Sequence, residues 1–332
     1  MNYIVTIFGL VLILYYGKPL LLPLATAVFM WYLIKSIAHY YQKYIKSGFL
    51  SQVLAGGSLM GLVYFFLVQV QPMFFELYRQ VPEINRGVES LLMQFYELTG
   101  IEILLDSFPT FQEIAASIGG AIAGFGTIVL FVFIYMIFIF VEQSGFHKKI
   151  AALFPTKRQL SQANFLLASI DQHMKKYLIL KTAISLATGL FSYVGLVVLG
   201  VPFSLVWAFI IFILNYIPTI GTIIGGLLPP LYILAVLNDV RLALVVAIWI
   251  AIVNFIFGNI LDPKMTGKSL NLSPLVILIN MVFWGLIWGP VGMFFSVPIL
   301  AMVYIATAQF DGLRWISILL SADGKIPDKN EE

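Results

Sequence analysis

The 332-residue sequence has no cysteine, only three histidines and few charged side chains. The absence of cysteine excludes a disulfide framework, an iron–sulfur cluster and thiolate catalysis. The histidines, His39, His147 and His173, do not pair at the spacing of metal ligands on a helix, so neither a metal nor another cofactor is expected. Charged residues make up 11% of the chain, against about a quarter in soluble proteins. So few charges exclude an ordinary soluble globule.

Apolar residues, in contrast, reach 61% of the chain, and the mean hydropathy is +0.97. They gather in long uncharged runs, and runs of about 18 or more apolar residues are typical of bilayer-spanning helices. The net charge of +3 comes from lysines that flank these runs, so membrane lipid is the expected partner and nucleic acid is not. The first 16 residues lack a basic n-region and are predicted to be a membrane segment rather than a cleavable signal. The sequence therefore predicts an all-α polytopic membrane protein.

Gly17, Lys18 and Pro19 interrupt the first apolar stretch. Each half of that stretch, 3–16 and 20–34, is short, about 22 Å or less as a helix. We therefore predict a shallow membrane hairpin with Lys18 at its tip.

The distribution of basic residues predicts the orientation. Segments 35–49 and 143–181 hold three and seven lysines and arginines, whereas segment 72–118 holds two, against seven acidic residues. Positive charge marks the cytoplasmic side. We therefore expect both termini of this membrane protein in the cytoplasm.

Two extramembrane segments show helical periodicity. In the acidic segment, apolar residues recur on one face at Ile84, Val88, Leu91, Leu92 and Phe95. In the basic segment, apolar residues step by three and four, which fits either a coiled-coil seam or, as we favour, an amphipathic helix along its own membrane domain. That set is Leu160, Ala163, Leu167, Ile170, Met174 and Tyr177.

The C-terminal half is interrupted by helix breakers at membrane depth. Residues 215–230 are dense in proline and glycine, and 273–309 would be about 55 Å long as one helix, too long for a bilayer core of about 30 Å. The second stretch must therefore fold back or break near Gly289 and Pro290. In total we expect eight to ten membrane segments, with broken or re-entrant helices in this half.

These features divide the chain into six predicted parts. They are an N-terminal membrane hairpin and third span (1–71), an acidic external helical segment (72–118), a fourth span (119–142), a basic cytoplasmic amphipathic helix (143–181), a core of broken helices (182–310) and a cytoplasmic tail (311–332).

Broken helices indicate where function lies, because exposed backbone in lipid costs several kcal/mol per unsatisfied group. Such backbone is tolerated where it is buried in protein or lines a cavity, and in transporters it marks the substrate site. Close packing of small residues is the structural alternative. The candidate site residues are Asn215, Pro218, Gly221, Gly225, Gly226, Pro229, Pro230, Asp262, Pro263, Lys264, Gly267, Gly289, Pro290 and Pro298.

Asp262 and Lys264 flank Pro263 at the end of a span. They are either an interfacial ion pair or helix stop, or a gate and a cation or proton site. Gly267-Lys268-Ser269 is not a phosphate loop, because the second glycine that such a loop needs is replaced by Asp262. We expect no enzyme activity.

Several motifs together resemble, in order and spacing, the autoinducer-2 exporter family of bacterial transporters. The motifs are Ile170–Tyr177 (IDQHMKKY), Leu199–Phe203 (LGVPF), Asn215–Gly221 (NYIPTIG), Leu261–Leu270 (LDPKMTGKSL), Ser273–Val276 (SPLV) and Gly289–Pro298. The resemblance covers nearly the whole chain. It implies a secondary transporter that exports the quorum-sensing signal autoinducer-2, and some relatives resemble sodium or lithium/proton antiporters. Trp284 and Trp288 depart from the small residues usual there and predict a narrower substrate path.

We therefore expect a secondary transporter of a small polar solute, with alternating access that moves 218–230 and 285–298 past Asn215 and Asp262. A homo-oligomer of unknown order is also expected. A cation/proton antiporter remains an alternative, although no acidic residue lies within an uninterrupted span. A non-transporting scaffold, binding partners through 72–118, is the other alternative, and it would not need broken helices.

Overall fold

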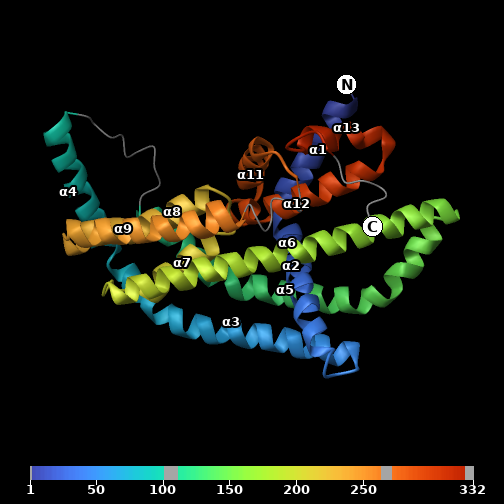
Figure 1. Ribbon diagram of the computed structural model, residues 1–332, viewed down its shortest axis with the longest axis horizontal. Helices are drawn as coiled ribbons and strands as arrows, with labels where there is room; N and C mark the ends of the chain where they lie inside the picture. Colours follow the sequence, from blue (N-terminus) through green and yellow to red (C-terminus); the bar gives the residue numbers. More distant parts are fainter. Residues whose placement is uncertain (1, 101–110, 263–270, 326–332) are drawn as a thin grey trace. The chain divides into compact units, whose positions relative to one another are not determined.

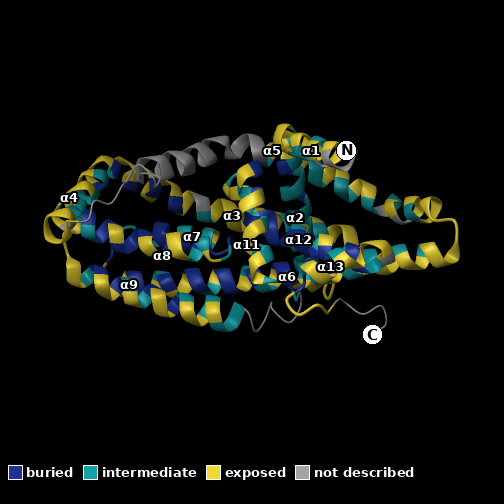
Figure 2. Cartoon of the chain, turned by 90° about the horizontal axis from the view of Figure 1, so that it is seen from above, coloured by how far each residue is buried: buried dark blue, intermediate teal, exposed yellow. Residues whose placement is uncertain are grey.

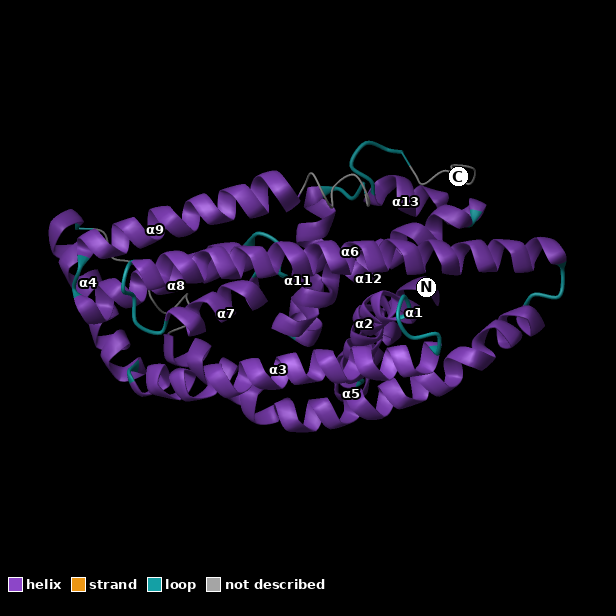
Figure 3. Ribbon diagram, turned by 60° about the horizontal axis from the view of Figure 1, so that its bottom comes forward, coloured by secondary structure: helices purple, strands orange, loops and turns teal. Residues whose placement is uncertain are grey.

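The computed structural model describes residues 2–100, 111–262 and 271–325 (Figure 1). Within these residues the regular structure is helical (Figure 3), and Leu272 and Ser321 form one isolated β-bridge. The described part contains six helices long and apolar enough to cross a membrane, and three shorter apolar helices. The prediction of an all-α polytopic membrane protein is confirmed. The long candidates are Lys18–Tyr41, Gly48–Arg79, Lys157–Val198, Ile220–Leu237, Val240–Leu261 and Pro290–Gln309.

The chain forms two compact units, each assembled from separate stretches of sequence. Unit 1 comprises Met1–Gly56, Thr127–Leu180 and Lys264–Glu332, and unit 2 comprises Gly57–Gly126 and Lys181–Pro263. Three long helices supply residues to both units: α3 (Gly48–Arg79), α5 (Phe111–Leu153) and α6 (Lys157–Val198). The six predicted parts follow the chain, whereas the compact units do not.

In unit 1 the N-terminal helices α1 (Asn2–Tyr16) and α2 (Lys18–Tyr41) run in series rather than as a hairpin. Gly17 between them has helical dihedral angles, its amide donates to the Ile13 carbonyl (2.8 Å), and its carbonyl accepts from Leu21 (2.9 Å). The predicted hairpin is wrong. Proline is tolerated in the first turn of a helix, so Pro19 permits continuation after Gly17 instead of forcing a reversal.

Helices α11 (Pro274–Trp288) and α12 (Pro290–Gln309) pack against each other in unit 1. The joint is Gly289, whose φ of +70° favours glycine, and Pro290 opens the next helix. A Cβ at Gly292 would overlap the Trp284 carbonyl oxygen, so glycine permits the close approach. The predicted fold-back of 273–309 at Gly289-Pro290 is confirmed. Pro298, in contrast, lies buried inside α12 without ending it.

The segment after α12 does not leave the fold as a simple tail. Helices η5 (Asp311–Leu313) and α13 (Arg314–Leu320) pack on α12. The buried hydroxyls of Ser317 and Thr307 hydrogen-bond at 2.7 Å. Residues 311–325 of the predicted cytoplasmic tail are therefore part of unit 1.

In unit 2 the amphipathic helix predicted in the acidic segment is present as α4 (Val81–Thr99), with Ile84 fully buried. It packs on the π-helix η2 (Ile233–Leu237). A Cβ at Gly87 would overlap the Ala235 carbonyl, so this glycine sets the distance of approach. The segment preceding α4 differs from expectation, because α3 continues past residue 71 to Arg79.

The basic helix predicted over 143–181 is divided between two helices, because residues 143–153 are the end of α5. Its remainder, from Lys157, continues without interruption into the span predicted after it, as α6. Along its N-terminal part the predicted apolar stripe faces the protein: Met174 and Tyr177 are buried, and Leu160, Ala163, Leu167 and Ile170 are half-buried. This burial favours an amphipathic helix packed on its own chain over a coiled-coil seam.

The core of unit 2 lies among α7 (Ser204–Leu214), α8 (Ile220–Tyr232) and α9 (Val240–Asn254). Helix α8 lies between the other two in the packing order, since it contacts both. The rings of Trp207 and Tyr232 pack together with their centroids 5.4 Å apart. The Tyr232 hydroxyl donates to Oε1 of Gln80, the residue between α3 and α4, at 3.0 Å. Figure 2 shows the buried positions, in dark blue, along α9 and, in unit 1, along α12.

Candidate functional site

The helix break predicted around Asn215 lies in unit 2 and is confined to residues 215–219. Thr219 has φ +60° and ψ −62°, a conformation that threonine rarely adopts. Pro218 cannot donate an amide hydrogen bond, and a Cβ at Gly221 would overlap the Leu214 carbonyl oxygen. Proline, a strained threonine and an obligatory glycine together interrupt the helix here.

The remaining glycines and prolines of this stretch lie within α8 and do not break it. Gly225 packs against Ile211 of α7, and Gly226 packs against the Asn254 amide of α9. Pro229 and Pro230 are buried inside the helix and precede the π-helix η2. These four residues therefore shape packing, whereas Pro218 and Gly221 define the break.

Polar side chains form a buried stripe on the C-terminal part of α6, at helical spacing of four, three and four residues. Lys181 is 5% exposed, and Ser185, Thr188 and Ser192 are fully buried. The Thr188 hydroxyl is satisfied by the Ile184 carbonyl (2.8 Å) within the helix. Buried polar groups in a membrane helix are costly and mark contacts between helices or solute paths.

Hydrogen bonds connect this stripe to the helix break. Asn215, which is 2% exposed, donates from Nδ2 to Ser185 Oγ at 2.9 Å. The Tyr216 hydroxyl donates to Thr182 Oγ1, also at 2.9 Å. The first two residues after α7 thus bond to α6 through their side chains, while the Asn215 amide still donates to the Ile211 carbonyl of α7.

A buried ion pair extends the same contact. Lys181 Nζ lies 2.7 Å from Asp262 Oδ2, and the two side chains are 6% and 22% exposed. Asp262 directly follows a seven-residue π-helix, η3 (Phe255–Leu261). Such π-helical turns are rare and frequent at functional sites. A buried charge needs a partner, so the two charged groups hold each other in place.

We call Lys181, Thr182, Ser185, Asn215, Tyr216 and Asp262 the polar seam. Sequence reasoning identified Asn215 and Asp262 but missed the α6 residues. The available signal was Lys181 itself, a lysine that no further charged residue follows before Asp239. Asp262 pairs with Lys181; the candidate residues Pro263, Lys264 and Gly267 lie outside the described residues.

Two buried polar atoms in unit 2 have no hydrogen-bond partner among the described residues, Ser192 Oγ and Asn254 Oδ1. Asn254 donates from its Nδ2 to the Thr222 carbonyl at 3.4 Å, so its oxygen alone is unsatisfied. An unsatisfied buried group costs about 1–3 kcal/mol. Such atoms are where water or a polar solute gains hydrogen bonds.

In unit 1 the candidate residues Gly289, Pro290 and Pro298 belong to the α11–α12 hairpin, where the Asn280 side chain is satisfied within the hairpin. Asn280 Nδ2 donates to the Ser296 carbonyl (2.7 Å), and Trp284 Nε1 donates to Asn280 Oδ1 (3.1 Å). The described residues contain no group of three or more acidic or histidine side chains that could hold a metal.

The two tryptophans that departed from the family pattern are core residues of unit 1. Their ring centroids lie 4.6 Å apart, and they pack with Leu22 and Ile287. Trp288 Nε1 donates to the Leu14 carbonyl at 3.0 Å. Their bulk fills the packing between α11 and the N-terminal helices.

Comparison with known sequences identifies the family of the chain. The AI-2E family transporter profile matches residues 3–311. The chain belongs to this family. The resemblance predicted from the motifs is confirmed, and this member of the AI-2E family is a multi-pass membrane protein.

Three relatives illustrate the range of similarity. The AI-2 transport protein TqsA of Escherichia coli (strain K12) is 45% identical over 145 residues, 44% of this chain and 42% of TqsA. YhhT of the same organism, named a candidate transport protein, is 39% identical over 144 residues, 43% of this chain and 41% of YhhT. A candidate transport protein of Haemophilus influenzae is 31% identical over 263 residues, 75% of each chain. This member of the AI-2E family thus matches about two fifths of the length of TqsA and YhhT.

Proposed function

We propose that this AI-2E family transporter is a secondary transporter that exports autoinducer-2, or a small polar solute of similar chemistry, across the bacterial inner membrane. The name of TqsA supports the solute, and the relatives named only as transport proteins support transport without a substrate. The charge distribution supports an orientation with both termini in the cytoplasm.

The observation that carries this proposal is the polar seam beside the helix break. Its donors and acceptors satisfy one another: Asn215 with Ser185, Tyr216 with Thr182, and Lys181 with Asp262. A polar solute that enters the seam can form hydrogen bonds with these groups in place of the bonds they make with one another. These new bonds offset the free energy that the solute loses when it leaves water. In alternating access, the stretches 218–230 and 285–298 move past such a site.

Efflux from proteoliposomes tests the proposal. Vesicles are loaded with autoinducer-2, and release is followed with and without an imposed proton or sodium gradient. Wild-type protein should release the signal faster than protein-free vesicles, and Asn215→Ala should lose most of that rate. Gln172→Ala, at an exposed position of α6, is the matched control and should release at the wild-type rate. Release that Asn215→Ala leaves unchanged would place the solute elsewhere.

The Lys181–Asp262 pair favours a second candidate, sodium or lithium/proton antiport. A carboxylate held by an ammonium group can exchange its partner for a proton or a cation. Sodium-dependent proton release that disappears in Asp262→Asn, without autoinducer-2 efflux in the wild type, would support antiport over solute export. Proteoliposomes that show neither flux would favour the scaffold alternative.

Orientation and assembly are proposed separately. The chain has no native cysteine, so single cysteines at the exposed positions Ser90 and Ser161 report without background. A cysteine at position 90 should react only from outside, and a cysteine at position 161 only from the cytoplasm.

Large exposed apolar side chains on α3, such as Tyr64 and Phe65, support contact with lipid or with another copy in a homo-oligomer. Crosslinking in membranes distinguishes these two.

A further inference from the structure

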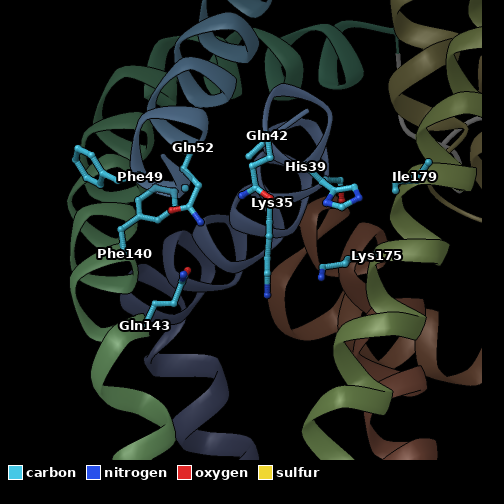
Figure 4. A pocket seen from close by; sticks show the side chains of 12 residues that line it. Lys35, His39, Gln42, Phe49, Gln52, Phe140, Gln143, Lys175 and Ile179 are labelled. Atoms are coloured by element: carbon cyan, nitrogen blue, oxygen red, sulfur yellow. The ribbon is translucent and has the colours of Figure 1, made fainter. Parts of the chain in front are cut away.

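Unit 1 contains a cavity that is separate from the polar seam (Figure 4). Its volume is about 760 Å³, and it is enclosed by α2, the start of α3, α5 and α6. The lining residues are Lys35, Ser36, Ala38, His39, Gln42, Gly48, Phe49, Gln52, Phe140, Gln143, Lys175 and Ile179. No carboxylate is among them, so the polar lining consists of two ammonium groups, an imidazole, a hydroxyl and three amides.

The two lysines are held in position by one carboxylate, that of Asp171, which pairs with both. Asp171 on α6 accepts from Lys35 on α2 at 3.1 Å and, through its other oxygen, from Lys175 one turn along α6. Lys35 also lies over the Trp31 ring, with Nζ 4.7 Å from the centroid. Each ammonium carries three donors, so each retains donors beyond its bond to Asp171. Two lysines against one aspartate leave an excess of positive charge at the cavity.

The cavity lies where apolar helices end. Helix α2 ends at Tyr41, α3 begins at Gly48, and the apolar stretch of α5 ends at Gln143. Polar side chains at such ends lie at headgroup depth, and basic pockets between helix ends bind anionic headgroups. Phe49, which is 73% exposed, adds an apolar side chain beside the polar lining.

We propose that this cavity binds a phosphate group, either from the headgroup of an anionic phospholipid or from a soluble phosphate ester. Lysine recognises phosphate as a point charge, and amide groups donate to the remaining oxygens. The site is distinct from the transport site and does not depend on the proposed function.

Binding is tested with the full-length protein in detergent micelles that contain phosphatidylcholine. One arm adds dioleoylphosphatidylglycerol, and the other adds inorganic phosphate or glycerol 3-phosphate. The thermal midpoint is followed as each probe is titrated, because a ligand of the folded state raises it. In the wild type at least one arm should raise the midpoint in a saturable way.

Substitutions distinguish the cavity from general surface charge. Lys35→Gln and Lys175→Gln each leave Asp171 with one lysine and should weaken the apparent Kd about fivefold, the effect of one lysine at a membrane surface. Lys176→Gln is the matched control, since Lys176 is exposed on the same helix and does not line the cavity. Gln52 lines the cavity but belongs to neither ion pair, so Gln52→Leu should weaken binding without disturbing Asp171. This variant therefore tests the cavity even if a lysine variant does not fold.

A response to phosphatidylglycerol alone identifies a lipid site, and a response to the soluble probes identifies a phosphate-ester site. The proposal is overturned if neither arm changes the midpoint, or if Lys176→Gln weakens binding as much as the cavity variants do. Unchanged affinity in Gln52→Leu together with either lysine variant that folds also overturns it.

Discussion

Both units contain a helix break made by glycine and proline, yet the two breaks differ in what surrounds them. In unit 1, Gly289 joins α11 to α12, and the nearby Asn280 accepts from Trp284 and donates to the Ser296 carbonyl. In unit 2, the break after α7 is tied through Asn215 to α6, near a buried ion pair. Glycine and proline end a helix at Pro218 and at Gly289, whereas Pro229, Pro230 and Pro298 lie inside helices. Buried charge and polar side chains beside the break are what distinguish a candidate transport site from a packed hairpin.

The largest effect is expected from Lys181→Met. It leaves Asp262 as a largely buried carboxylate without its lysine, and breaking a buried pair costs about 3 kcal/mol or more. The thermal midpoint in detergent should fall and efflux should be lost. In the double variant Lys181→Met with Asp262→Leu, stability should recover because no charge is stranded, while efflux stays absent. Recovery of both properties would show that the pair only supports the fold.

The second effect concerns the glycine that permits the break in unit 2. Gly221→Ala introduces a Cβ that overlaps the Leu214 carbonyl oxygen, whereas Gly225→Ala meets Ile211 Cα at an ordinary 3.4 Å. We expect Gly221→Ala to lower the free energy of unfolding by about 2–3 kcal/mol and to abolish efflux. Gly225→Ala should change stability by less than about 1 kcal/mol and retain most of the efflux. Equal effects of the two substitutions would contradict a break localised at 215–219.

A pair of asparagines tests directly whether the two breaks differ in function. Asn215→Leu and Asn280→Leu each remove buried amide hydrogen bonds, so each should cost about 1–3 kcal/mol of stability. Only Asn215→Leu should also lower the efflux per folded molecule, by about tenfold or more. Efflux is measured at equal amounts of folded protein. A comparable loss in Asn280→Leu would place both breaks in the solute path.

The smallest effect lies away from both breaks, where the C-terminal segment meets residue 271. Asn271 Nδ2 donates to Asp323 Oδ1 at 2.7 Å, and this bond is the main reason why the pKa of the exposed Asp323 is lowered. A lowered folded-state pKa contributes stability above the unfolded pKa, and that contribution disappears as the pH falls through the folded pKa. Asn271→Ala should raise the pKa of Asp323 toward its ordinary value, as followed by nuclear magnetic resonance of labelled aspartate. Efflux at neutral pH should not change.

Local patterns in the sequence were sufficient for several features because their cause is local. The apolar face of α4 follows from helical periodicity, and Ile84 is buried as predicted. The reversal at Gly289-Pro290 could be predicted because a single helix over 273–309 would be longer than the bilayer core is thick. The same local reasoning gave a wrong prediction at Gly17. Glycine followed by lysine and proline fits both a turn and a kinked helix. Only packing of α1 and α2 along α11 selects the second.

What the sequence determined by itself is the membrane class, the helical periodicity, the two helix breaks near Asn215 and Gly289, and the family, since all of these depend on composition and on neighbouring residues. What the tertiary structure decided is which polar groups meet. Lys181 and Asp262 are 81 residues apart in sequence, and Asn215 reaches Ser185 across 30 residues. A helix face can be predicted from periodicity, but the partner of a buried charge is chosen by the packing of distant helices, because a charge removed from water is stable only where an opposite charge is brought to it.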